Sequence, residues 1–423
     1  MPQGQEIVSI LRRHGTPYFF SKIIPGLFGL AAVPIFARLY GFEGYGQIML
    51  LLALGNFITV FSGGWLCQSW IRFQMTWVEK RQLFKAGILS TAVAAIILVC
   101  IFFILGLIKH DNWNPTFAQF YPVIFMTIGM LFYYVIHGGL QSALQSKQVL
   151  IISVLSSVLS LLFPIITFLF TENINGFIVS YGLAYFIAAA LGMFLFPHKD
   201  LSYHSSNSDL NHWIQYGAPL SIWLALQALI PFIDRIIIQL YLGSDMVGKY
   251  SALSELVMRG FSLILFPMTM AIQPIMIRYW NTNHQSKAIT LWHQVLKLIG
   301  IILLLMGIIY FFVNDWALII LNKFLGASHQ YSSTFLLLIM LSGFFWQANL
   351  LIHKPLELVK KTTLMTVYLI TALMIMVMIS IYSIAEFGLL GVATASLMAA
   401  MVYCVLSLFK GINIFKQKMY SIK

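Results

Sequence analysis

A chain of 423 residues in which 60% are hydrophobic and 9% are charged is too apolar for an ordinary soluble protein. The formal net charge of +12 does not require a nucleic-acid partner. The basic residues fall mainly between apolar runs, where they set the orientation of a membrane protein. Cys67, Cys100 and Cys404 are isolated within apolar segments, which excludes a disulfide framework and a cysteine-based metal site. We interpret them as packing residues.

Apolar runs of the length that a helix needs to cross a bilayer follow one another along the chain. Their continuous hydrophobicity favours helices over the alternating strands of a membrane barrel. In chain order, the predicted spans are 16–38, 45–70, 84–108, 117–140, 149–170, 174–196, 213–241, 248–277, 291–313, 333–353, 363–385 and 388–410. We therefore predict an all-α polytopic membrane protein with about 12 transmembrane helices.

The basic residues are divided unequally between the two sides of this helix order. Of the 25 lysines and arginines, three lie within spans and four (Arg38, Lys109, Lys249 and Lys323) lie on one side, which leaves eighteen on the other. The eighteen lie in the two terminal segments and in or beside the connections that follow the even-numbered spans. The positive-inside rule therefore predicts a multi-pass protein with both termini in the cytoplasm.

The two parts of the chain resemble each other weakly. The stretch from Leu39 to Tyr45 after the first span is echoed by the stretch from Leu240 to Tyr250 after the seventh, an offset of about 200 residues. The segment Thr116–Tyr121 is likewise echoed by Gly326–Tyr331. We predict an N-terminal six-helix half (1–196), a cytoplasmic linker (197–212) and a C-terminal six-helix half (213–423). Two such pseudo-symmetric halves around a central cleft are typical of transporters.

The linker contains His198, His204 and His212, whose irregular spacing on a polar stretch favours solvated side chains over a metal site. We therefore predict no metal ligands.

Five ionisable residues fall well inside predicted spans, where a charge is costly and marks a functional candidate. They are Lys22 in the first span, Asp234 and Arg235 in the seventh, and Glu255 and Arg259 in the eighth.

Each of the five also has a structural reading. Glu255 and Arg259 are four residues apart, the spacing of an ion pair within one helix. Asp234 and Arg235 are adjacent, so their side chains diverge by about 100° and cannot both satisfy each other. Lys22 and Arg235 lie near enough to span ends that snorkelling toward the interface is an alternative to facing a cavity.

Two short motifs carry a resemblance to a known family. The first is the run Ala37-Arg38-Leu39-Tyr40-Gly41-Phe42-Glu43-Gly44-Tyr45-Gly46, and the second runs from Asp234 to Gly243 and on through Val247-Gly248-Lys249-Tyr250-Ser251-Ala252. With the six-plus-six helix layout, they resemble the Wzx flippases of the multidrug/oligosaccharidyl-lipid/polysaccharide (MOP) exporter superfamily.

This resemblance implies a flippase that moves an undecaprenyl-pyrophosphate-linked oligosaccharide from the cytoplasmic to the periplasmic leaflet by alternating access. The implied location is a bacterial inner membrane, and the implied role is O-antigen (lipopolysaccharide) or related surface polysaccharide biosynthesis. The partners would be the lipid-linked oligosaccharide, the bilayer and other polysaccharide-assembly membrane proteins. The family has no catalytic motif to carry over, so we expect no enzyme activity.

A pyrophosphate gives the buried charges a role. Lys22, Arg235 and Arg259 would line the cleft as a cationic substrate-binding cavity, because ammonium and guanidinium groups form charge-assisted bonds with phosphate oxygens. Asp234 and Glu255 would serve ion coupling or charge pairing. No cofactor is predicted, and coupling to H+ or Na+ is left open. His137 is a weaker candidate for proton coupling, since a hydrogen-bonded histidine explains it more simply.

Two other classes of membrane protein are alternatives. A MATE-like exporter of small molecules or cations would share the layout, although three cations against two anions oppose a cationic substrate. A membrane polysaccharide polymerase or glycosyltransferase would more often carry a large outer loop or an acidic metal-binding pair; here the longest outer connection is 314–332 and no Asp-x-Asp occurs.

Overall fold

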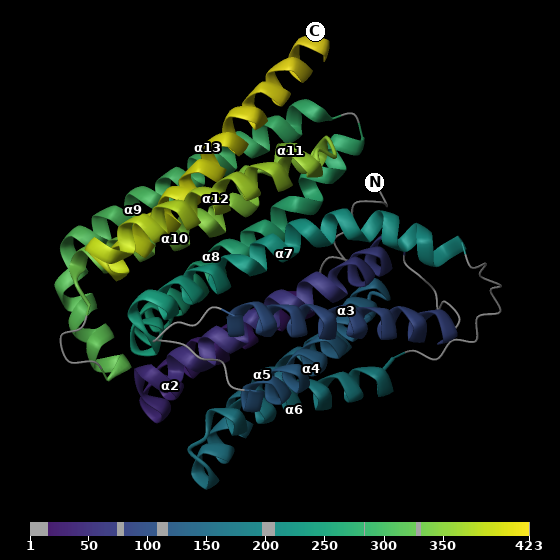
Figure 1. Cartoon of the computed structure of the whole chain (residues 1–423). Coiled ribbons are helices and arrows are strands. Elements are labelled where there is room, and N and C mark those ends of the chain that lie inside the picture. Colours follow the sequence, from purple (N-terminus) through teal and green to yellow (C-terminus); the bar gives the residue numbers. More distant parts are fainter. Residues whose placement is uncertain are drawn as a thin grey trace. The chain divides into compact units, whose positions relative to one another are not determined.

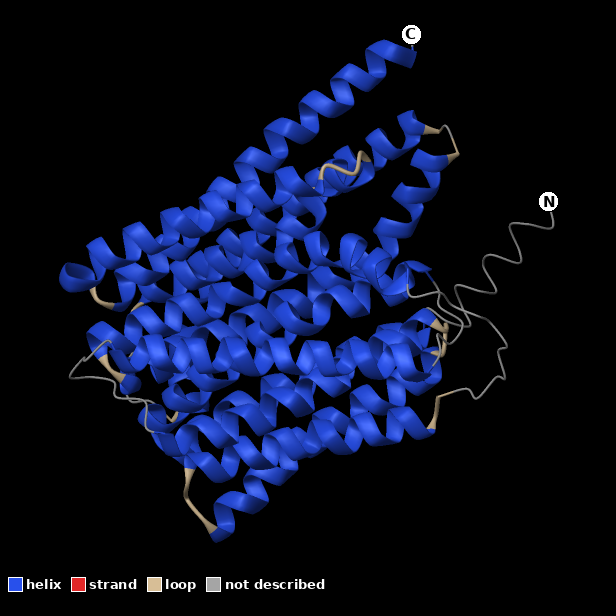
Figure 2. Ribbon diagram, turned by 45° about the vertical axis from the view of Figure 1, so that its right-hand side comes forward, coloured by secondary structure: helices blue, strands red, loops and turns tan. Residues whose placement is uncertain are grey.

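The computed structural model describes residues 16–73, 80–107, 117–196, 208–282, 284–326 and 331–422, and every regular element in these ranges is a helix (Figure 2). The helices are α2 (Thr16–Phe73), α3 (Lys80–Leu107), α4 (Phe117–Ser142), α5 (Ser146–Phe170), α6 (Ile174–Phe194), α7 (Ser208–Leu242), α8 (Ser244–Asn281), α9 (Gln285–Leu325), α10 (Ser333–Ile352), α11 (Lys354–Leu358), α12 (Thr362–Phe387) and α13 (Leu389–Ile422) (Figure 1).

Within the described ranges, eleven helices are long and apolar enough to cross a membrane. The first of these stretches, Thr16–Trp70, has 55 residues, which at helical rise is roughly 80 Å and enough for two crossings. The helix is interrupted at Gly41, where φ is 66° and ψ is 172°. The predicted spans 16–38 and 45–70 lie on either side of this break. The prediction of an all-α membrane protein with about 12 transmembrane helices is thus confirmed.

Several helices extend beyond the predicted spans. Helix α9 continues to Leu325, so the expected outer connection 314–332 is helical over its first two thirds. The reason is the apolar run after Asp315, which sustains the helix until Gly326 ends it in a left-handed conformation. Helix α13 similarly continues to Ile422. Helix α7 begins at Ser208, inside the stretch 197–212 assigned to the linker; residues 197–207 of that stretch, with His198 and His204, lie outside the described residues.

The chain divides into two compact units, one formed by Met1–Ala32 with Gly44–Phe232 and the other by Val33–Glu43 with Ile233–Lys423. These boundaries differ from the predicted halves 1–196 and 213–423 because two long helices contribute to both units. Helix α2 places Val33–Glu43 in the second unit, and helix α7 passes from the first unit to the second after Phe232, the residue that follows Pro231.

In the first unit, the N-terminal part of α7 packs closely on α2. Ser69 donates a hydrogen bond of 2.7 Å to the carbonyl of Trp213, and Gly217 lies against the backbone of Trp65. Helices α4 and α6 also lie side by side with α5 (Figure 1). The contacts between α2 and α7 explain why residues up to Phe232 belong to this unit.

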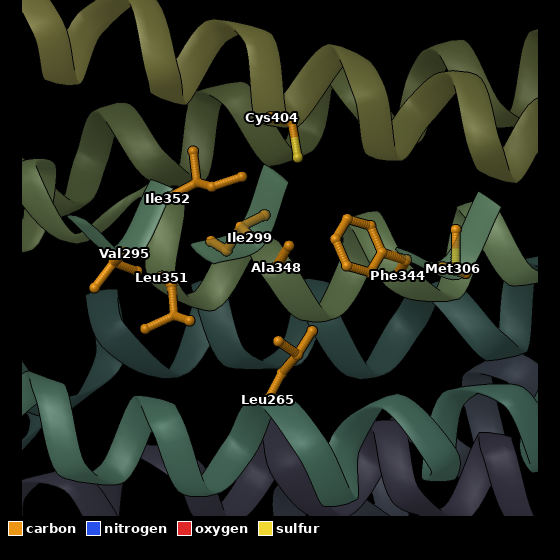
Figure 3. Close-up of a cluster of buried hydrophobic side chains, with 9 residues drawn as sticks. All are labelled: Leu265, Val295, Ile299, Met306, Phe344, Ala348, Leu351, Ile352 and Cys404. Atoms are coloured by element: carbon orange, nitrogen blue, oxygen red, sulfur yellow. The ribbon is translucent and has the colours of Figure 1, made fainter. Parts of the chain in front are cut away.

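The second unit has a core formed by α8, α9, α10 and α13. Its buried side chains include Leu265, Ile299, Phe344, Leu351 and Cys404 (Figure 3). Burial of such side chains stabilises helix association less in lipid than in water, so close packing supplies the cohesion.

Two turns in the second unit share one backbone conformation. Gly243, between α7 and α8, has φ of 83° and ψ of 174°, which nearly repeats the values at Gly41. Only glycine adopts this region readily. Gly248 at the start of α8 lies against the carbonyl of Phe42, so a side chain at position 248 would push the two turns apart. These are the stretches around Gly41 and Gly243 that echo each other in the sequence.

Candidate functional site

The second unit contains a cluster of charged side chains between α7 and α8, which we call the α7–α8 charge cluster. It consists of Asp234 and Arg235 on α7 and of Tyr250, Ser251, Glu255 and Arg259 on α8. On α8, Ser251, Glu255 and Arg259 recur every four residues and therefore share one face of the helix.

Arg235 connects α7 to α8. Its Nη2 donates to Glu255 Oε1 at 2.6 Å, and its Nε donates to Ser251 Oγ at 3.0 Å. The Arg235 side chain is 5% exposed. The guanidinium is therefore buried in the protein with a carboxylate of α8 as its partner and does not extend to the protein surface.

Glu255 accepts from a second arginine through its other oxygen. Arg259 Nε donates to Glu255 Oε2 at 3.0 Å, which is the ion pair that the four-residue spacing indicates. The Arg259 side chain is 38% exposed and that of Glu255 is 21% exposed. One carboxylate thus serves two guanidinium groups, of which one is buried and the other accessible.

Asp234 has a different partner from its neighbour in the sequence. Tyr250 donates its hydroxyl proton to Asp234 Oδ2 at 2.7 Å, whereas Oδ1 is buried and has no hydrogen-bond partner among the described residues. The side chains of Asp234 and Arg235 therefore make separate contacts with α8, as the divergence of adjacent helical positions requires.

Lys22 lies on α2 in the first unit and is exposed. It is close enough to Cys67 and His137 to interact with both electrostatically. His137 is half-buried, and its ring centroid lies 5.7 Å from that of Tyr133. The structure thus brings Arg235, Arg259, Asp234 and Glu255 together in the second unit and places Lys22 in the first.

The three cysteines are not part of the α7–α8 charge cluster. Cys67 and Cys404 are buried as expected, and Cys404 donates to Asn349 Oδ1 at 2.8 Å, whereas Cys100 is exposed on the apolar helix α3. No group of three or more His, Cys, Asp or Glu side chains that could hold a metal ion occurs in the described residues.

Sequence reasoning missed several members of the buried polar set. Tyr250 and Ser251 belong to a motif that we noted only as a family feature, although the spacing of Ser251 from Glu255 places it on the same helix face. His353 was assigned to the end of the span 333–353, and Lys354 and Glu357 to the cytoplasmic connection after it. His353 and Lys354 are 1% and 5% exposed. Their i, i+4 and i, i+3 spacings were the available signal.

Chemically, the α7–α8 charge cluster offers an accessible guanidinium whose orientation is fixed by a shared carboxylate. Such a group suits an anion with several oxygens, because a guanidinium donates in a planar fork. The candidate cations are thus Arg235 and Arg259 in the second unit and Lys22 in the first.

A family described as "Polysaccharide biosynthesis protein" matches residues 12–280, which is more than half of the chain. The chain belongs to this family. The matched residues include Lys22 and the whole α7–α8 charge cluster. No curated protein sequence matches the chain.

Several solved structures share the fold of this family member. The lipid II flippase MurJ in an inward closed conformation is similar with a TM-score of 0.67 and 13% identity, over 94% of this chain and 88% of that one. A MATE family multidrug resistance transporter of the MOP superfamily, inward-facing, gives 0.58 and 14%, over 96% and 94%. A MOP superfamily transporter from Pyrococcus furiosus gives 0.59 and 14%, over 96% and 95%; the reverse polarity of that transporter's binding pocket suggests a different function for it. The resemblance to the MOP superfamily is confirmed at the level of fold.

Proposed function

We propose that this polysaccharide biosynthesis protein is a flippase that moves an undecaprenyl-pyrophosphate-linked oligosaccharide from the cytoplasmic to the periplasmic leaflet. The product would serve O-antigen or a related surface polysaccharide. The family match over residues 12–280, together with a fold shared with a lipid II flippase, carries this proposal. The lipid anchor would stay in the bilayer while the charged head group crosses, which requires a polar path within the protein.

The buried charges support an anionic substrate. Arg259 is accessible, is held by Glu255 and lies on a helix that is otherwise apolar around it. Lys22 is exposed on α2. We assign substrate binding to Lys22, Arg235 and Arg259. Within the second unit, Arg259 would contact the pyrophosphate and Arg235 would orient Arg259 through Glu255.

Movement by alternating access needs an energy source, and Asp234 is the candidate that we propose for coupling to H+ or Na+. Its Oδ1 is buried without a hydrogen-bond partner among the described residues, a position that a bound ion or proton would satisfy. Glu255 is less suitable, because both of its oxygens already accept from arginines.

The function is tested by following the lipid-linked intermediates in cells lacking the protein. We expect complete lipid-linked repeat units to accumulate on the inner leaflet while surface polysaccharide is lost, because a transporter is needed only after the unit is assembled. Extraction and mass analysis of the lipids would check this. Absence of the completed unit itself would indicate a biosynthetic enzyme instead.

The proposed inner-membrane topology gives a second prediction. In a chain whose three native cysteines are replaced by serine, a cysteine at exposed Thr282 should resist an impermeant thiol reagent added to intact cells, and a cysteine at exposed Glu172 should react. Both should react after permeabilisation. Reaction at Thr282 in intact cells would reverse the assigned orientation and the cytoplasmic termini.

A MATE-like exporter is the second candidate, because a MATE transporter shares the fold over 96% of the chain. It would confer resistance to small organic cations and leave lipid-linked sugars correctly distributed. The arginine-rich cluster opposes such substrates by like-charge repulsion.

A further inference from the structure

Helix α9 is longer than a membrane crossing requires. Its 41 residues correspond to roughly 60 Å at helical rise, whereas the hydrocarbon core of a bilayer is about 30 Å thick. Exposed Lys297 places one interface near the start of the helix, because an ammonium group within the core is costly. The roughly 20 residues that a crossing needs then bring the helix to Trp316. The remainder of α9 therefore lies at or beyond the opposite interface, which the proposed topology places outside.

This last part of α9, residues 312–325, carries an exposed apolar stripe, and we call it the α9 end segment. The stripe consists of large side chains spaced along one face of the helix, namely Phe312, Trp316, Ile319, Ile320 and Phe324. Their exposed fractions range from 47% at Phe324 to 74% at Phe312. On the opposite face, Leu318 and Leu321 are half-buried and Leu325 is buried. One face of the segment thus packs on the protein and the other is left to a partner outside it.

Membrane lipid is the partner that fits this stripe. The stripe continues from the part of α9 that crosses the bilayer, where Leu305 and Ile309 are exposed on the same face. Tryptophan is typical of the membrane boundary, as Trp316 is here. Lys323 lies on the same face, and its long side chain can keep the ammonium group among the lipid head groups. Figure 1 shows the last turns of α9 (green) directed away from the line of its first part, as a helix entering the interfacial layer requires.

Hydrogen bonds hold the α9 end segment to the second unit at both ends. Just before it, Tyr310 donates its hydroxyl proton to the carbonyl of Ser333 at 2.7 Å. Near its end, Arg38 Nη2 donates to the carbonyl of Lys323 at 2.6 Å, and Gly326 lies against the Arg38 side chain. The last carbonyls of a helix lack partners within the helix and carry partial negative charge, so a guanidinium beside them is favourable.

We propose that the α9 end segment is a lipid anchor, which lies in the interfacial layer with its stripe against glycerophospholipids, and that Arg38 holds its end on α2. Arg38 belongs to the motif 37–46 and precedes the break in α2 at Gly41 by three residues. The anchor therefore holds α2 at a fixed depth beside this break. This assignment goes beyond the proposed function, because it requires only that the chain crosses a bilayer and involves no transported substrate.

The test uses the full-length protein, with its three native cysteines replaced by serine, in vesicles of phosphatidylethanolamine and phosphatidylglycerol. A nitroxide attached to Trp316→Cys, Ile320→Cys or Phe324→Cys reports collisions with oxygen, which concentrates in lipid, and with a nickel chelate, which stays in water. We expect the ratio of oxygen to nickel collisions at all three positions to be severalfold higher than at Glu172→Cys, an exposed position in the turn before α6. Ile309→Cys, in the crossing part of α9, should give a higher ratio still.

Two results would overturn the anchor. Ratios at Trp316→Cys, Ile320→Cys and Phe324→Cys as low as at Glu172→Cys would show that the segment lies in water. Spin–spin broadening at Ile320→Cys that persists when the protein is diluted with lipid would show that a second copy of the chain covers the stripe.

The role of Arg38 is tested in the Ile320→Cys chain. Arg38→Gln shortens the side chain and removes its charge, so it should raise the mobility of the nitroxide and lower its oxygen-to-nickel ratio severalfold. Lys323→Gln is the matched control, because it removes a charge at the same contact but keeps the carbonyl that Arg38 binds; it should leave the mobility unchanged. Unchanged mobility in Arg38→Gln would overturn the holding role of Arg38. No readout here depends on a lipid-linked sugar, so the lipid analysis tests the flippase assignment separately.

Discussion

Glu255→Gln should lower the amount of folded protein more than any other single change in the α7–α8 charge cluster. It deprives Arg235, whose side chain is 5% exposed, and Arg259 of the carboxylate that they share. Removing one partner of a buried ion pair costs about 3 to 5 kcal/mol. Size-exclusion profiles and thermal unfolding of the detergent-solubilised protein would measure the loss.

The arginine variants make this prediction specific. Arg235→Gln alone should be milder, because Arg259 still pairs with Glu255, and in the Glu255→Gln background it should restore much of the folded protein by removing the buried charge. Glu386→Gln, at an exposed position near the end of α12, is the matched control and should have no effect. If Glu255→Gln were as stable as the wild type, the ion pairs of the cluster would not contribute to the stability of the fold.

Arg259→Gln and Lys22→Gln should each reduce transport of the lipid-linked oligosaccharide by about tenfold or more while protein abundance stays near normal. The reason is that a charge-assisted bond to a phosphate contributes about 1.5 to 3 kcal/mol, whereas accessible side chains tolerate a neutral polar group. Arg259→Lys should recover part of the activity, since the charge returns without the planar fork. Transport would be measured as arrival of the lipid-linked unit in the outer leaflet of reconstituted vesicles.

A control and a decisive combination complete this test. Arg278→Gln, at an exposed position in the last turn of α8, removes a charge from the same helix and should leave transport unchanged. The triple variant Lys22→Gln, Arg235→Gln, Arg259→Gln should be inactive. Full transport by the triple variant would end the cationic-site mechanism whatever substrate the protein carries.

The turns around Gly41 and Gly243 show what a short sequence repeat predicts about the structure and what it does not. Both stretches are recognisable as a repeat in the sequence, and both glycines adopt a conformation that other residues rarely allow. What the repeat does not indicate is that Phe42 and Gly248 come into contact, so that residues 33–43 join the second unit. Contact between distant segments depends on packing, which no short motif encodes.

The sequence by itself determined the helical membrane fold, because hydrophobicity sustained over a bilayer thickness leaves the backbone no alternative to a helix. It also identified the five charged residues within spans, since their insertion cost makes them stand out from apolar neighbours. The partners of those residues were decided only by the tertiary structure. The spacing of Glu255 and Arg259 indicated one pair, but Arg235 joins them from another helix, and Tyr250 reaches Asp234 across the α7–α8 contact. The burial of His353 and Lys354 was equally invisible, because a polar residue at a helix end is read as solvated until the packing of α10, α11 and α13 removes it from water.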